Sequence, residues 1–182
     1  MTNLRGARLA PGTAVVDASL RLVAAVLSFA LLACSGPTSP DRFDPPPPGE
    51  VSEVATAIVD LTNAQRRQSG LATLTVNARL TQAAQIQADQ MVRAGLLAHV
   101  LPNATYPRPE DRLDAVSYDW EVFAENLASG QPTPAAAVTD WMRSSGHRDN
   151  ILNRSITEMG AGYARDSNGR AYWAQVFGRP SS

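Results

Sequence analysis

"EMGAGYARDSNGRAYWAQVFG", Glu158 to Gly178, is the stretch that decides the fold class of this chain. Its two ends are runs of small, aromatic and β-branched residues, and they flank the polar segment "RDSNGR". An Asn-Gly pair between two such runs is a strong local signal for a tight turn between antiparallel strands. We therefore predict a β-hairpin that turns at Asn168-Gly169.

Helical patterns precede this hairpin. Val54, Ile58 and Leu61 follow an i, i+4, i+7 spacing, with Ser52 as a candidate N-cap and Gly70 as the stop. A second helix is predicted after Asn77, which can cap it, and ends at Gly95. Its apolar stripe comprises Leu80, Ala83, Ala84, Ala88 and Met91.

A third helix is predicted to open at Thr133-Pro134, a cap followed by proline at the first helical position. It runs through Val138, Trp141 and Met142 and ends at Gly146. Helices first and a hairpin last predict an α+β domain in which helices pack on a mainly antiparallel sheet. We expect this domain to span residues 51–182, with Trp141 in its core.

The N-terminal residues 1–33 have the features of an export signal. Three arginines precede an apolar run from Leu22 to Ala33, which is well short of the roughly 20 residues that span a bilayer. The run ends in "LLAC", which resembles the lipobox of bacterial lipoproteins and predicts lipidation of Cys34. Cys34 is the single cysteine of the chain, so an intrachain disulfide is excluded. A buried, unmodified thiol is the alternative.

Residues 34–50 are predicted to form a tether between the lipidated cysteine and the domain. Six prolines between Ser35 and Gly49 favour an extended, polyproline-like chain. The predicted location is the cell envelope, with the domain outside the cytoplasm and anchored to a membrane. A formal net charge of −1 disfavours nucleic acid as a partner, because phosphate neutralisation supplies most of that affinity.

Six segments, in order along the chain, resemble the CAP superfamily (cysteine-rich secretory, antigen 5 and pathogenesis-related proteins) in its bacterial, cysteine-free form. They are "LTNAQRRQSGLATLTVNARLTQAAQ", "AH", "AENLASG", "WMRSSGHRDNILN", "EMGAGYA" and "YWAQVFG". The resemblance implies an α-β-α sandwich with a cleft lined by a histidine and a glutamate. His99 and Glu125 match these two residues.

The chain departs from the eukaryotic pattern of this family at three positions. Tyr172 stands where a second cleft histidine is expected, and Ser144 stands near the place of a second glutamate. Ala98 replaces the usual serine before the first histidine. His147, in the bacterial segment "GHR", is expected to occupy the space that the missing residues would fill.

His99, Glu125 and His147 are therefore the candidate site residues. His147 lies near the start of a predicted helical turn, where the helix dipole favours a neutral imidazole. Two imidazoles and a carboxylate suit a divalent cation such as Zn²⁺ or Mg²⁺, and they equally suit acid-base chemistry without metal. Spacing does not choose between these, and purely structural roles for Glu125 and His147 also stay open.

Three functions follow from these patterns. The first is a binding module that recognises a small ligand, lipid, divalent cation or envelope component through the cleft. The second is a metal-assisted or acid-base hydrolase using His99, Glu125 and His147. The third is a structural lipoprotein with a vestigial cleft. The chain has no GxSxG elbow and no glycine-rich phosphate loop, so binding is favoured over catalysis.

Overall fold

The computed structural model describes residues 48–182. The predicted signal peptide, Cys34 and most of the tether lie outside the described residues. The described elements are α1 (Pro48–Gln68), β1 (Thr75–Val76), α2 (Ala78–Ala94), α3 (Pro109–Ala115), β2 (Trp120–Ser129), α4 (Pro134–Arg143), α5 (Ser145–Ile151), β3 (Glu158–Arg165) and β4 (Ala171–Pro180). Within this part of the chain, no helix combines the length and apolar character needed to cross a bilayer.

The sheet has the strand order β1-β3-β4-β2. The predicted hairpin is present: β3 and β4 pair antiparallel from Glu158 opposite Gly178 to Arg165 opposite Ala171. Gly169 adopts a φ of 78° in the connecting turn, a conformation that glycine tolerates without strain. β2 also pairs antiparallel with β4, and the short β1 pairs parallel with β3. The sheet is therefore mixed but mainly antiparallel, as predicted.

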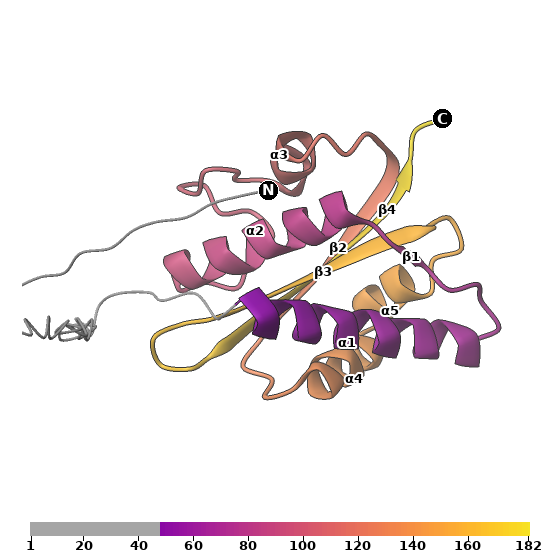
Figure 1. Ribbon diagram of the computed structural model, residues 1–182, viewed down its shortest axis with the longest axis horizontal. Coiled ribbons are helices and arrows are strands. Elements are labelled where there is room, and N and C mark those ends of the chain that lie inside the picture. The colour runs from indigo at the N-terminus through magenta and orange to yellow at the C-terminus, as the bar shows by residue number, and fades with distance from the viewer. Residues whose placement is uncertain (1–47) are drawn as a thin grey trace, which may run out of the picture. The chain divides into compact units, whose positions relative to one another are not determined.

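Helices cover both faces of the sheet. α1, α4 and α5 lie on one side, and α2 and α3 lie on the other (Figure 1). Alternate residues along β2, β3 and β4 enter two separate apolar clusters, as the pleat of a strand requires. Trp141 lies in the cluster on the α1 side with 1% of its surface exposed. The domain is thus an α-β-α sandwich.

Glycines in the hairpin allow α2 to approach the sheet closely. A Cβ atom added at Gly160 would collide with the backbone of Leu80 and Thr81, and one at Gly162 would collide with the backbone of Ala84. The contact joins backbone to backbone, so no side chain can move aside to relieve it. The spacing of the two glycines in "EMGAGYA" is therefore explained by the helix that lies across β3.

Most predicted helix ends are confirmed, and two are wrong. Asn77 caps α2 by accepting hydrogen bonds from the backbone N–H groups of Arg79 and Leu80, and Thr133 caps α4 in the same way. Ser52 is not an N-cap: α1 begins four residues earlier at Pro48, and the Ser52 carbonyl accepts a hydrogen bond from Thr56 within the helix. The first turn contains Glu50, whose charge favours the N-terminal end of a helix dipole.

The predicted end of the third helix at Gly146 is also wrong. α4 ends at Arg143, and Ser144 adopts an extended conformation with ψ of 122°. Ser144 thereby terminates α4 and starts α5, which contains Gly146 and His147 in its first turn. The extended Ser144 changes the direction of the chain so that the two short helices do not form one continuous helix.

Candidate functional site

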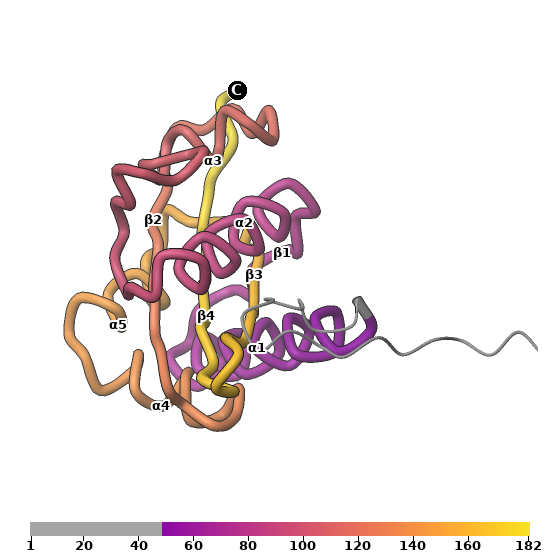
Figure 2. Tube along the Cα trace, turned by 90° about the vertical axis from the view of Figure 1, so that its left-hand side faces the viewer, coloured from indigo at the N-terminus to yellow at the C-terminus, as the bar shows by residue number. Residues whose placement is uncertain are grey.

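The candidate site lies at the β2 edge of the sheet. Figure 2 shows that α5 and the chain between α2 and α3 both lie along this edge. We call residues 96–108, which connect these two helices, the His99 loop. β2 places Glu125 and Asn126 in adjacent positions, and adjacent side chains of a strand point to opposite faces. Glu125 therefore faces the His99 loop, and Asn126 faces α5.

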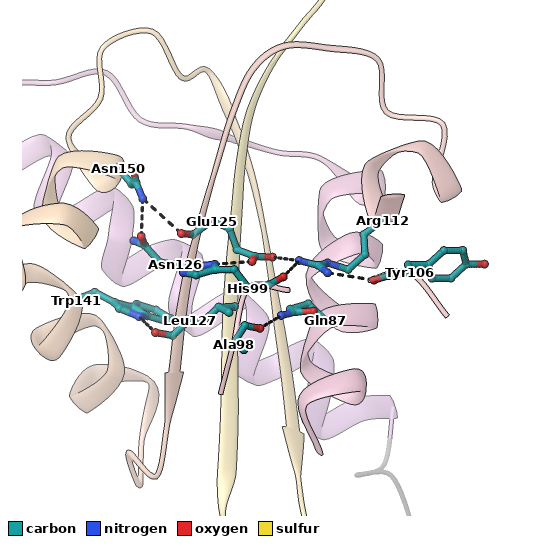
Figure 3. A network of polar contacts seen from close by, with 10 residues as sticks. All are labelled: Gln87, Ala98, His99, Tyr106, Arg112, Glu125, Asn126, Leu127, Trp141 and Asn150. Carbon is teal, nitrogen blue, oxygen red and sulfur yellow. Dashed lines mark hydrogen bonds and ion pairs between the residues drawn. The ribbon is translucent and has the colours of Figure 1, made fainter. Parts of the chain in front are cut away.

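The carboxylate of Glu125 binds two partners, one at each oxygen (Figure 3). Its Oε1 lies 2.8 Å from Nδ1 of His99, and its Oε2 accepts a hydrogen bond of 2.8 Å from Nη2 of Arg112. The Glu125 side chain is only 4% exposed, whereas that of His99 is 53% exposed. The structure thus brings together two of the three predicted residues as a buried carboxylate behind an accessible imidazole.

Arg112, which the sequence did not identify as a site residue, is the second partner. Its side chain is 1% exposed, and it also donates hydrogen bonds to the backbone carbonyls of His99 and Tyr106. Arg112 lies on α3, a helix that the sequence analysis missed. Pro109 followed by Glu110 and Asp111 in the first turn was the available signal for that helix.

Asn126 connects the other face of β2 to α5. Its Nδ2 donates to the backbone carbonyl of His147 and to Oε1 of Gln175, each at 3.0 Å. Its Oδ1 accepts from Nδ2 of Asn150 at 2.9 Å (Figure 3). Gln175 continues the network to the hydroxyl of Thr62 on α1. Buried polar groups are costly unless they are paired, so this network holds α5 in one position against the sheet.

His147 is held near the site through its backbone. Burial lowers the pKa of its imidazole, and the charge of His99 lowers it further. Both effects favour the neutral form, which agrees with the state expected from the sequence. The hydrogen bonds found for the Glu125 carboxylate go to His99 and Arg112 and not to the His147 imidazole.

The grouping of possible metal ligands bears on the predicted metal site. In residues 48–182, no group of three or more histidine, cysteine, aspartate or glutamate side chains is placed to hold a metal ion. Metal binding by His99, Glu125 and His147 stays a prediction.

The surroundings of His99 are apolar and open. Leu96, Leu97 and Val100, each close to half exposed, belong to the His99 loop. A neighbouring pocket of about 380 Å³ has Leu96 and Leu101 in its wall, with Arg93. His99, Glu125 and His147 are not among the residues that line this pocket, and the exposed ring of His99 lies on the surface near it.

Two residues that depart from the eukaryotic pattern, Tyr172 and Ala98, have defined places in the structure. Tyr172 is buried in the apolar cluster on the α2 side and pairs with Ser129, whereas Glu125 pairs with Val176. Tyr172 therefore lies farther along the strands than the His99–Glu125 pair. Ala98 accepts a hydrogen bond at its carbonyl from the buried side chain of Gln87, which anchors the residue next to His99 (Figure 3).

Comparison with known proteins identifies the family. The model of CAP, the cysteine-rich secretory protein family, matches residues 59–177. The chain belongs to this family. It is 35% identical over 130 residues to the uncharacterized protein YkwD of Bacillus subtilis (strain 168), covering 71% of this chain. The chain spans about half of that relative, 49% of its length.

Two solved structures resemble the domain. One is an extracellular protein containing an SCP domain from Bacillus anthracis str. Ames, with a TM-score of 0.65 and 26% identity, covering 75% of this chain and 45% of that one. The other is an outer surface protein from Borrelia burgdorferi, with a TM-score of 0.66 and 17% identity, covering 77% and 100%. The second likeness is one of fold alone. Both agree with the CAP sandwich described above.

Proposed function

We propose that this CAP-family chain is an extracytoplasmic lipoprotein of the cell envelope that binds a small ligand, lipid or envelope component through the imidazole of His99. The N-terminal pattern ending in Cys34 supports the anchor. The extracellular protein of Bacillus anthracis and the outer surface protein of Borrelia burgdorferi support a location outside the cytoplasm.

The contact between His99 and Glu125 is the observation that carries the binding role. A carboxylate only accepts hydrogen bonds, so Nδ1 of His99 is the donor in this contact and carries the proton. Nε2, on the opposite side of the exposed ring, is then the atom left for a ligand. A ligand that forms a hydrogen bond with an imidazole nitrogen, for example through a hydroxyl group, matches this atom.

The residues around His99 indicate the rest of the ligand. Exposed aliphatic side chains that gather in one place mark interaction sites more often than scattered ones do. Leu97 and Val100 flank His99 in the sequence and are 47% and 49% exposed. A ligand with an apolar part beside its hydrogen-bonding group would cover both features.

Co-sedimentation tests this proposal. The full chain is incubated with purified cell-wall sacculi and, separately, with vesicles of bacterial polar lipid, and the bound fraction is measured for wild type, H99A and E125Q. We expect binding to one of these materials and at least a tenfold loss in both variants. T139A, a change on the exposed face of α4, serves as the control. Equal retention of wild type and H99A would refute the role of His99.

A hydrolase is the second candidate function, and the same contact favours it. A carboxylate that orients a histidine prepares the opposite ring nitrogen to act as a general base. The co-sedimentation samples distinguish the two functions. Release of soluble fragments from sacculi or lipid by wild type, and not by H99A or E125Q, would indicate hydrolysis rather than binding alone.

A further inference from the structure

The edge of the sheet opposite the candidate site is formed by β1 and β3 (Figure 2). β1 covers only the first part of β3, where it pairs with Glu158 and Met159. β3 continues to Arg165, and no described strand lies beside it on this side after Met159. The N–H and C=O groups of an uncovered strand edge are free to pair with another extended chain.

Gln85 of α2 closes one position of this edge. Its side-chain amide donates to the carbonyl of Tyr163 at 2.9 Å and accepts from the N–H group of Tyr163 at 3.1 Å. A carboxamide thus takes the place that a neighbouring strand would fill. The same contacts show that the backbone groups of Tyr163 point away from β4, and those of every second residue along β3 point the same way.

Ala161, two residues before Tyr163, is the position that neither β1 nor Gln85 reaches. The carbonyl of Asn77, next in line after β1, instead accepts hydrogen bonds from the N–H group and the hydroxyl of Thr81 in α2. Among residues 48–182, no partner for the N–H or C=O group of Ala161 is found at this edge. Ala161 is 1% exposed, and buried backbone groups are nearly always paired, so this position is suited to a ligand.

A groove lies over this position. It has a volume of about 520 Å³, and residues of α1 and α2 line it together with Ala161. Its walls are mainly apolar and include Ala55, Val59 and Val76, of which Val76 is 58% exposed. Among the described residues that line it, Asp60 is the one with a charge. The groove therefore suits an occupant that combines aliphatic side chains with a positive charge.

We propose that this groove binds a short peptide in the extended conformation, which pairs with Ala161 as an added strand and places a basic side chain near Asp60. One residue of such a peptide offers a C=O group to the N–H of Ala161 and an N–H group to its C=O. The peptide continues the line of β1 along β3. An acyl chain would fill apolar space but would leave both backbone groups of Ala161 unpaired. The inference goes beyond the proposed function, because it uses neither His99 nor the β2 edge.

Titration of the ¹⁵N-labelled full chain with a peptide, followed by nuclear magnetic resonance, tests the proposal. The probe is an acetylated tetrapeptide amide of valine, alanine, valine and lysine. We expect saturable shifts of the amide signals of residues 160–163, and D60N should weaken binding about threefold, as for a partly exposed ion pair. T56W, which places a large ring in the groove from an exposed position of α1, should abolish the shifts. E53W, at an exposed position of α1 outside the groove, is the matched control.

Methylation of the peptide nitrogens separates strand addition from apolar binding. Each N–H group of the probe is methylated in turn, and every methylated probe is measured on the wild-type protein. Only one N–H group of an added strand faces Ala161, so one methylated probe should bind about tenfold more weakly, and the probe methylated at the next nitrogen should not. Because no variant is involved, this measurement decides the question even if T56W does not fold.

Several results would overturn the proposal. They are the absence of saturable shifts in the wild type, equal binding by a folded T56W, and weakened binding at every methylated position or at none. Decanoate is titrated in parallel, and shifts caused by decanoate but not by the peptide would assign the groove to an acyl chain. Shifts that follow protein concentration without any probe would assign it to a second copy of the chain. Either assignment would also overturn the proposal.

Discussion

Replacing Trp141 by alanine tests how the helical layer supports the site. Trp141 is 1% exposed, and its indole N–H donates a hydrogen bond of 3.0 Å to the carbonyl of Leu127 on β2. Truncation of a large buried aromatic costs about 3 to 5 kcal/mol. We expect the upper part of this range, because the variant also leaves the Leu127 carbonyl without its partner, which costs about 1 to 3 kcal/mol.

The expected loss corresponds to a fall in Tm of roughly 10 to 20 °C for a domain of this size. Urea and thermal unfolding, followed by far-ultraviolet circular dichroism, measure it without depending on tryptophan fluorescence. W141F removes the hydrogen bond and part of the ring while keeping an aromatic side chain, with an expected loss of at least about 1 to 3 kcal/mol. W120F, at a half-buried position, is the control. A loss below about 1 kcal/mol in W141A would refute the packing described for α4.

Three further predictions concern the anchor, the helix-sheet contact and pH. C34S should move the protein from the membrane fraction to the soluble one, since dual acylation holds a protein more firmly than one chain does; equal retention would exclude lipidation. G160A should cost about 1 to 3 kcal/mol or more because its Cβ meets the backbone of Thr81, whereas G146A, with open space around it, should not destabilise; a neutral G160A in urea unfolding would contradict the close approach of α2. The pKa of His147 is lowered in the folded state, so just below the ordinary value of 6.5 the folded state binds fewer protons than the unfolded state. The free energy of unfolding should therefore fall as pH falls through that value. H147N should weaken this dependence, and an unchanged slope of stability against pH in H147N would contradict the role of His147.

Local signals were enough to predict much of the fold. The Asn168-Gly169 turn, the Asn77 and Thr133 caps and the stop at Gly70 depend on a few neighbouring residues, and each is present in the structure. The predicted start of α1 after Ser52 and the predicted end of the third helix at Gly146 were wrong. They depend on a choice between competing caps and on packing, which a short window of sequence does not contain.

The candidate site, like the fold, was predicted from the sequence only in part. By itself the sequence determined the family, the candidate residues His99, Glu125 and His147, and the expectation of a neutral His147, because these follow from ordered motifs and from residue chemistry. Tertiary structure alone decided that Arg112 completes the Glu125 pair, and that His147 is held by its backbone and not by its ring. The physical reason is distance along the chain: the His99–Glu125 contact joins residues 26 positions apart, and a buried arginine has no local pattern that marks which carboxylate will meet it.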